Sequence, residues 1–170
     1  AHAQKRVALV VGNSAYQNVP TLANPANDAN AIADLFRRNG FDVVEAKTDL
    51  GNTDFKRVVR EFSNSARDAD VAVTYFGGHG VDIGGKNYLL PVDAKLTSDQ
   101  DADDEAVSLD RIMAMLRGAK RLRVVLLETT ARLQHPAADA QQIVEVQHAF
   151  LVLLELRQQH RVHGPADDGP

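Results

Sequence analysis

The protein has 170 residues, with 19 Lys and Arg against 23 Asp and Glu, a formal net charge of -4 and no cysteine. Its 44% apolar and 25% charged residues are typical of one globular domain and exclude a disordered chain. The mild acidity argues against general nucleic-acid binding, which needs clustered Lys and Arg, and the missing thiol excludes disulfides, thiolate zinc sites and a cysteine nucleophile.

The first three residues permit two interpretations. Ala1, His2 and Ala3 place small residues on either side of an arbitrary one, as a signal peptidase requires at its cleavage site. The segment is either the end of an export signal, which predicts a periplasmic or secreted domain, or part of a linker in a cytoplasmic protein. No run approaches the roughly 18 apolar residues that cross a bilayer.

Short apolar runs alternate with helical segments along the first half of the chain. Residues 6–12, 41–46 and 71–76 are predicted strands, and the first of them, RVALVVG, has the continuous β-branched character of a strand buried on both faces. A helix is predicted over residues 27–39 and ends before Gly40. A second helix begins at Thr53 and Asp54, with apolar residues at helical spacing: Phe55, Val58, Val59, Phe62 and Ala66.

The pattern continues as far as residue 127. Residues 77–94, GGHGVDIGGKNYLLPVDA, predict a tight hairpin at Gly84 and Gly85. An acidic loop over residues 97–105 precedes Ser108, which is expected to cap a helix over residues 109–116. A further strand is predicted at 122–127. This alternation predicts an α/β fold with a mainly parallel sheet and helices on both faces.

Beyond Leu127 the sequence changes in character. Residues 128–142 are polar and rich in alanine, residues 143–156 predict an apolar helix, and residues 157–170 resemble a solvated tail. We therefore divide the chain into a domain of residues 5–127 and an atypical C-terminal helix and tail of residues 128–170.

His79 is the candidate general base. Ligands gather at the carboxyl ends of parallel strands, where the segments GNSAY, GGHG and ETTAR compete. Glycines on both sides of His79 let a substrate approach the imidazole closely. The alternative is a structural or surface histidine, and the sequence leaves the two readings open. The other histidines lack zinc-ligand spacing, so no metal is assigned to them.

Four segments, taken together, resemble the caspase-like cysteine peptidases, the group of caspases, metacaspases and paracaspases. They are KRVALVVGNSAY, NPANDANAIADLFRRNGFDV, DVAVTYFGGHGVDIGGKNYLLPVDA and KRLRVVLL. The resemblance covers about residues 5–127 and implies a three-layer α/β/α sandwich, a His and Cys dyad on adjacent strand ends, and peptide-bond hydrolysis through a thioester. It places His79 on the family's histidine and N–H groups around Gly78 and Gly80 in an oxyanion hole.

The likeness stops at the second half of the dyad. Family members follow such a strand with an acidic residue, a small residue and the cysteine, and this chain has Glu128, Thr129 and Thr130 there. Thr130 therefore occupies the nucleophile position. Because an imidazole does not readily deprotonate a hydroxyl, the chain is predicted to be inactive or nearly so. A change of reading frame in the gene would also produce this abrupt boundary.

Two acidic residues match the family's specificity pocket. By resemblance to metacaspases, Asp28 and Glu128 bind the Arg or Lys that precedes the cut, and converging carboxylates are suited to a guanidinium. Alternatively, Asp28 only faces the helix dipole and Glu128 is an ordinary loop residue. The acidic run at 99–105 suggests calcium, which some metacaspases need, although it lacks the EF-hand pattern. No other cofactor is expected.

The sequence thus predicts a caspase-like cysteine-type endopeptidase domain that has lost its nucleophile. The alternative is a pseudoenzyme that binds basic peptides or a partner protein. A generic phosphate binder is disfavoured because GNSAY is not a glycine-rich cradle. The expected partner is a peptide or protein with basic residues, without nucleic acid or a membrane span, and no oligomeric state is predicted.

Overall fold

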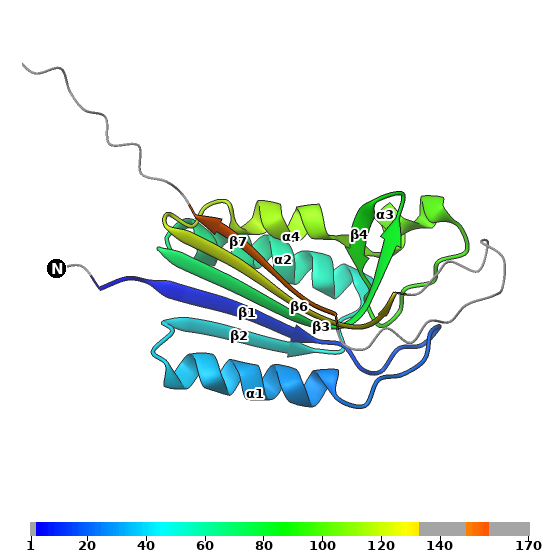
Figure 1. Ribbon diagram of the computed structural model, residues 1–170, viewed down its shortest axis with the longest axis horizontal. Coiled ribbons are helices and arrows are strands. Elements are labelled where there is room, and N and C mark those ends of the chain that lie inside the picture. Colours follow the sequence, from blue (N-terminus) through cyan, green and yellow to red (C-terminus); the bar gives the residue numbers. More distant parts are fainter. Residues whose placement is uncertain (1–2, 133–148, 157–170) are drawn as a thin grey trace, which may run out of the picture.

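The computed structural model describes residues 3–132 and 149–156 (Figure 1). Its strands are β1 (Arg6–Gly12), β2 (Val43–Thr48), β3 (Val71–Ile83), β4 (Lys86–Leu89), β5 (Val107–Ser108), β6 (Leu122–Arg132) and β7 (Ala149–Leu156). Its helices are α1 (Pro25–Arg38), α2 (Asn52–Arg67), α3 (Ala102–Glu105) and α4 (Leu109–Leu116), with one 3-10 turn at Asp99–Asp101.

The strands form one seven-stranded sheet with a parallel centre. The neighbours β2, β1, β3 and β6 all run parallel, and β7 closes the β6 side as an antiparallel strand. The last residues of β3 pair with β4 in a hairpin, and β4 pairs with β5. The predicted α/β fold with a mainly parallel sheet is confirmed.

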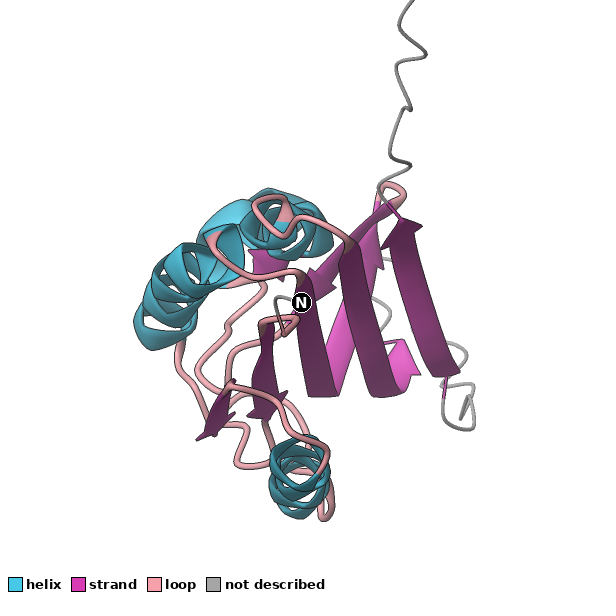
Figure 2. Ribbon diagram, turned by 90° about the vertical axis from the view of Figure 1, so that its left-hand side faces the viewer, coloured by secondary structure: helices cyan, strands magenta, loops and turns pink. Residues whose placement is uncertain are grey.

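Helices cover both faces of the sheet, as the alternation of side chains along β1 requires (Figure 2). Val7, Leu9 and Val11 pack in one core cluster with residues of α2 and α4. Val10 points the other way and packs with Ala29 and Ala33 of α1. The predicted three-layer sandwich is therefore present: of the helices in the described residues, α1 covers one face and α2 and α4 cover the other.

Local signals predicted several elements well. The first strand has the predicted bounds, and the α2 positions predicted to be apolar and inward are all buried. The Ser108 hydroxyl accepts a hydrogen bond from the N–H of Arg111 at 3.1 Å, as a helix cap does. Gly84 and Gly85 form the hairpin turn with φ of 61° and 81°, values that L-residues rarely adopt.

Three predicted elements differ substantially from the structure. The strand predicted at 122–127 continues as β6 to Arg132, so Glu128 lies in a strand and is not a loop residue. The third strand does not end at residue 76, because β3 runs through the GGHG segment to Ile83 and only then turns. The predicted helix over 143–156 is wrong for its second half, where residues 149–156 form β7. A short apolar run does not distinguish helix from strand by periodicity, and pairing with the open edge of β6 decides it.

Some predictions fall outside the described residues or are not tested. Residues 143–148, the tail at 157–170 and the pair Ala1 and His2 lie outside the described part. The division of the chain at Leu127 stays a prediction. None of the helices in residues 3–132 combines the length and apolar character needed to cross a membrane.

The acidic loop before α4 uses its carboxylates within the protein. Asp101 accepts hydrogen bonds from the backbone N–H groups of Thr97 and Ser98 and from the Thr97 hydroxyl. The bonds from Thr97 and Ser98 lower the pKa of Asp101. Asp103 accepts from the Tyr88 hydroxyl at 2.8 Å, and Glu105 from the N–H of Lys95. These contacts give the acidic residues of the loop a structural role. Calcium binding by this loop stays a prediction.

Replacing Thr74 with valine is expected to stabilise the domain by about 1 kcal/mol. Thr74 is 2% exposed, and its hydroxyl has no hydrogen-bond partner among the described residues. Its register neighbours are Leu9 and Val125, so the hydroxyl lies in an apolar layer where an unpaired polar group is costly. Valine keeps the shape and removes this cost.

Urea denaturation of the wild-type and Thr74→Val proteins measures the difference in their free energies of unfolding. Thr48→Val is the matched control, because Thr48 is an exposed strand residue of β2. Its effect on the free energy of unfolding is expected to stay within about 0.5 kcal/mol. A Thr74→Val protein less stable than the wild type would contradict the conclusion that the buried Thr74 hydroxyl destabilises the domain.

Candidate active site

Strand β1 ends at Gly12, which is in register with Gly77 of β3 and, through it, with Glu128 of β6, so the GGHG segment and residues 128–130 lie at the edge of the sheet where β1 ends (Figure 1). Gly78 pairs with Thr129 and Gly80 with Arg132, so one residue of β3 lies opposite two of β6. This bulge places the backbone of His79 beside that of Thr130 and Ala131 on the adjacent strand. The fold therefore juxtaposes the two positions that the resemblance assigned to the dyad.

The imidazole of His79 is buried and held in one tautomer. It is 3% exposed, and its Nε2 lies 2.8 Å from the carbonyl oxygen of Pro20. A carbonyl only accepts hydrogen bonds, so Nε2 carries the proton and Nδ1 does not. Nδ1 is buried without a partner among the described residues. Burial lowers the pKa of His79, so the ring is neutral near pH 7 and has a lone pair available to accept a proton.

Tyr16 supports His79 from the loop after β1. Its hydroxyl accepts a hydrogen bond from the backbone N–H of His79 at 2.8 Å and donates one to the carbonyl of Leu90 at 3.1 Å. The tyrosine and imidazole rings are also in contact, with centroids 4.6 Å apart. Tyr16 was not among the predicted site residues, although it belongs to the segment KRVALVVGNSAY that resembles the family.

A second set of hydrogen bonds fixes the same loop. The buried amide of Asn13 donates to the carbonyl of Leu90 and accepts from the N–H of Leu50. The carboxylate of Asp49 accepts from the N–H groups of Ser14 and Ala15. Because Pro20 lies in this loop, the same contacts fix the position of the Pro20 carbonyl oxygen, which accepts the hydrogen bond from His79.

One backbone N–H group in the segment predicted to form the oxyanion hole is not available to bind an oxyanion. The N–H of His79 is already bonded to Tyr16, so donation from this stretch falls to Gly78 and Gly80, whose role stays a prediction. A Cβ at Gly78 would lie 2.5 Å from the Tyr16 hydroxyl oxygen. Glycine is thus needed at residue 78 for the tyrosine to reach the His79 amide.

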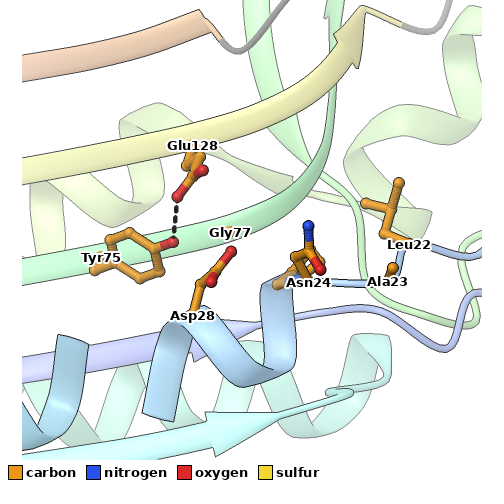
Figure 3. A pocket seen from close by; sticks show the side chains of 8 residues that line it. Leu22, Ala23, Asn24, Asp28, Tyr75, Gly77 and Glu128 are labelled. Carbon is orange, nitrogen blue, oxygen red and sulfur yellow. Dashed lines mark hydrogen bonds between the residues drawn. The ribbon is translucent and has the colours of Figure 1, made fainter. Parts of the chain in front are cut away.

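Asp28 and Glu128 line one pocket of about 140 Å³ (Figure 3). Asp28 comes from the first turn of α1, and Glu128 from β6, where it is in register with Gly77 of β3. The Tyr75 hydroxyl donates a hydrogen bond to Oε2 of Glu128 at 2.7 Å. Burial, with the bond to Glu128, raises the pKa of Tyr75, so it remains a neutral donor. The other lining residues are Leu22, Ala23, Asn24 and Pro25.

Gly77 lines the pocket and lies two residues before His79 on β3, although His79 itself is not among the lining residues. The site thus combines a proton acceptor with two carboxylates that converge from different elements. Asp28 also keeps its place in the first turn of a helix, so the alternative reading of that residue holds alongside the pocket. Within residues 3–132 and 149–156, no cluster of three or more His, Asp or Glu side chains is arranged to hold a metal ion.

Comparison with known proteins identifies the family of the domain. The sequence profile of the caspase domain matches residues 5–158. The human mucosa-associated lymphoid tissue lymphoma translocation protein 1 is 33% identical over 92 residues, as is its mouse homolog. These matches cover 54% of this chain but only 11% of each relative, so the chain spans a small part of their length. The match over residues 5–158 shows that the chain belongs to the caspase domain family.

Proposed function

We propose that this caspase-fold domain binds an arginine or lysine side chain of a peptide or protein in the pocket of Asp28 and Glu128, and that it does not hydrolyse the peptide at an appreciable rate. The observation that carries the proposal is the convergence of two carboxylates, from α1 and β6, on one small pocket.

The electrostatics of the pocket favour a cation. Two carboxylates from different elements face the same space, and Tyr75 adds a polar group without adding positive charge. A guanidinium presents planar donors that can pair with both carboxylates at once, and such charge-assisted bonds are stronger and more directional than neutral ones. An acidic side chain would be repelled by the two carboxylates, and an apolar one would displace water from them without offering a hydrogen bond in return.

Inactivity follows from the chemistry of the nucleophile position. The chain has no cysteine, and Thr130 stands in β6 next to the bulge with His79. A neutral imidazole readily forms a thiolate from a thiol but not an alkoxide from a threonine hydroxyl. Threonine nucleophiles usually use their own N-terminal amine as the base, and Thr130 is internal to the chain.

Residual peptidase activity is the second candidate function. It is favoured by one observation: the unprotonated Nδ1 of His79 is buried without a partner among the described residues. Incubation with fluorogenic arginine peptides separates the candidates. The proposal expects no turnover at high protein concentration, whereas turnover that His79→Ala abolishes would support residual catalysis.

The change Asp28→Asn is expected to weaken binding of an arginine peptide by about tenfold or more, because a hydrogen bond to a charged partner contributes about 1.5–3 kcal/mol. Isothermal titration calorimetry on the whole chain measures the effect. Asp34→Asn is the matched control, since Asp34 lies on the same helix with an exposed carboxylate paired to Arg37. Equal affinities for both variants, or no binding by the wild type, would refute the pocket assignment.

A further inference from the structure

We propose that Tyr75 is a positioning residue of the acidic pocket, whose hydroxyl orients the Glu128 carboxylate so that the pocket prefers arginine to lysine. The inference deepens the proposed function and rests on it. Sequence patterns gave no sign of this role, because a tyrosine in a buried strand is usually a core residue.

The tyrosine is anchored at one end and polar at the other. Tyr75 is 2% exposed, and its ring belongs to the core cluster with Val10, Ala29 and Ala33 between the sheet and α1. Its hydroxyl reaches the pocket and donates to Oε2 of Glu128 at 2.7 Å. Figure 3 shows this hydroxyl directed at Glu128, with the carboxylate of Asp28 nearby. The packed ring therefore holds its hydroxyl, a single hydrogen-bond donor, in a fixed position at the pocket.

The same hydroxyl lies close to Gly77 and Pro25, which also line the pocket. A Cβ built on Gly77 would lie 3.1 Å from the Tyr75 hydroxyl and 3.5 Å from Cβ of Pro25. Gly77, Tyr75 and Pro25 are therefore close neighbours in the lining of the pocket. A ligand that enters this space meets the tyrosine hydroxyl as well as Asp28 and Glu128.

A fixed Glu128 matters more for a guanidinium than for an ammonium. With one carboxylate oxygen bonded to Tyr75, rotation of the carboxylate is restricted and the direction of its other oxygen is determined. A guanidinium carries its donors in a rigid fork, so it gains from acceptors held at matching directions. An ammonium is a compact charge with rotatable donors and depends mainly on the total negative charge. Loosening Glu128 should therefore reduce arginine binding more than lysine binding.

The chain contains a second tyrosine–carboxylate pair, outside the pocket, which provides a matched control. Tyr88 is 4% exposed and donates to Oδ1 of Asp103 at 2.8 Å, so it is also a buried tyrosine bonded to one carboxylate. Neither Tyr88 nor Asp103 lines the pocket of Asp28 and Glu128. The change Tyr88→Phe removes an equivalent hydrogen bond without touching the proposed binding site.

Titration with N-acetyl-arginine amide and N-acetyl-lysine amide, followed by NMR on the whole chain, tests the inference. Tyr75→Phe should weaken the arginine ligand by about tenfold and the lysine ligand by about threefold or less. Tyr88→Phe should change neither. In a double-mutant cycle with Glu128→Gln, the two losses should be clearly non-additive, because Tyr75 acts through Glu128. A second readout uses the wild type: the Tyr75 hydroxyl proton resonance should shift when the arginine ligand binds.

The outcomes separate this inference from the proposed function. If the wild type binds neither amide, the proposed function itself is wrong. If the wild type binds arginine with the expected loss in Asp28→Asn, but Tyr75→Phe keeps the wild-type affinity and arginine-to-lysine ratio, only the role of Tyr75 is overturned. Additive losses in the cycle, or a Tyr75 hydroxyl resonance unchanged at saturation, would also overturn it.

Discussion

Replacing Thr130 with cysteine is expected to give this domain peptidase activity after arginine, with a rate increase of about three orders of magnitude or more over the parent chain. The reason lies in the state of His79. Its Nε2 proton is bonded to Pro20, which leaves Nδ1 as the acceptor beside the strand that carries residue 130. A thiol at that position loses its proton far more readily than a hydroxyl, and the thiolate is an intrinsically strong nucleophile.

The assay is hydrolysis of a fluorogenic arginine peptide by purified protein, before and after thiol alkylation. Thr130→Cys with His79→Ala should be inactive, and Thr129→Cys, which places the same thiol one residue away in β6, should also be inactive. Thr130→Ser should gain little, because a serine hydroxyl has the same difficulty as threonine. A folded Thr130→Cys protein that binds arginine amide but shows no turnover would mean that the altered sequence beyond residue 127 lacks more than the nucleophile.

The layers of the fold were predictable because each depends on a local signal. The run RVALVVG predicts a buried parallel strand, the apolar stripe of α2 predicts its buried face, and Ser108 predicts the start of α4. Strand β7 was not predictable in this way. Its residues are apolar apart from Glu155, and only the unpaired edge of β6, which is a tertiary feature, determines that they form a strand rather than a helix.

The candidate site was likewise predictable only in part. His79 was named from its glycine-flanked place at a strand end, and Asp28 and Glu128 from the resemblance, and the parallel pairing of β3 with β6 explains why distant residues meet at one edge. Tyr16 and Tyr75 were missed, because their roles depend on hydrogen bonds across 63 and 53 residues of sequence. A tyrosine in a loop or a buried strand carries no such information by itself. The supports of a site are therefore harder to recognise in sequence than its charged groups.

The close approach of α1 to β1 leads to the second large prediction: Gly12→Ala should destabilise the domain by about 3 kcal/mol, which corresponds to a fall in Tm of about 10 °C. A Cβ on Gly12 would lie 2.2 Å from the carbonyl oxygen of Pro25 and 2.6 Å from Cβ of Ala29. The first of these atoms is helix backbone, so no side-chain rotation relieves the clash. The helix must move away from the sheet, and the cluster of Val10, Ala29 and Tyr75 must open.

Gly85→Ala separates this packing cost from the general cost of replacing glycine. Nothing lies within 4 Å of a Cβ at residue 85, but its φ of 81° is strained for alanine, so a loss of about 1–2 kcal/mol is expected there. Thermal melts of both variants should rank Gly12→Ala as the more damaging. Because Asp28 belongs to the same helical turn as Pro25, any folded Gly12→Ala protein should also bind arginine amide more weakly, whereas Gly85→Ala should retain full affinity. Equal melting temperatures, together with equal affinities, would show that α1 is not held against β1 in the way that positions the pocket.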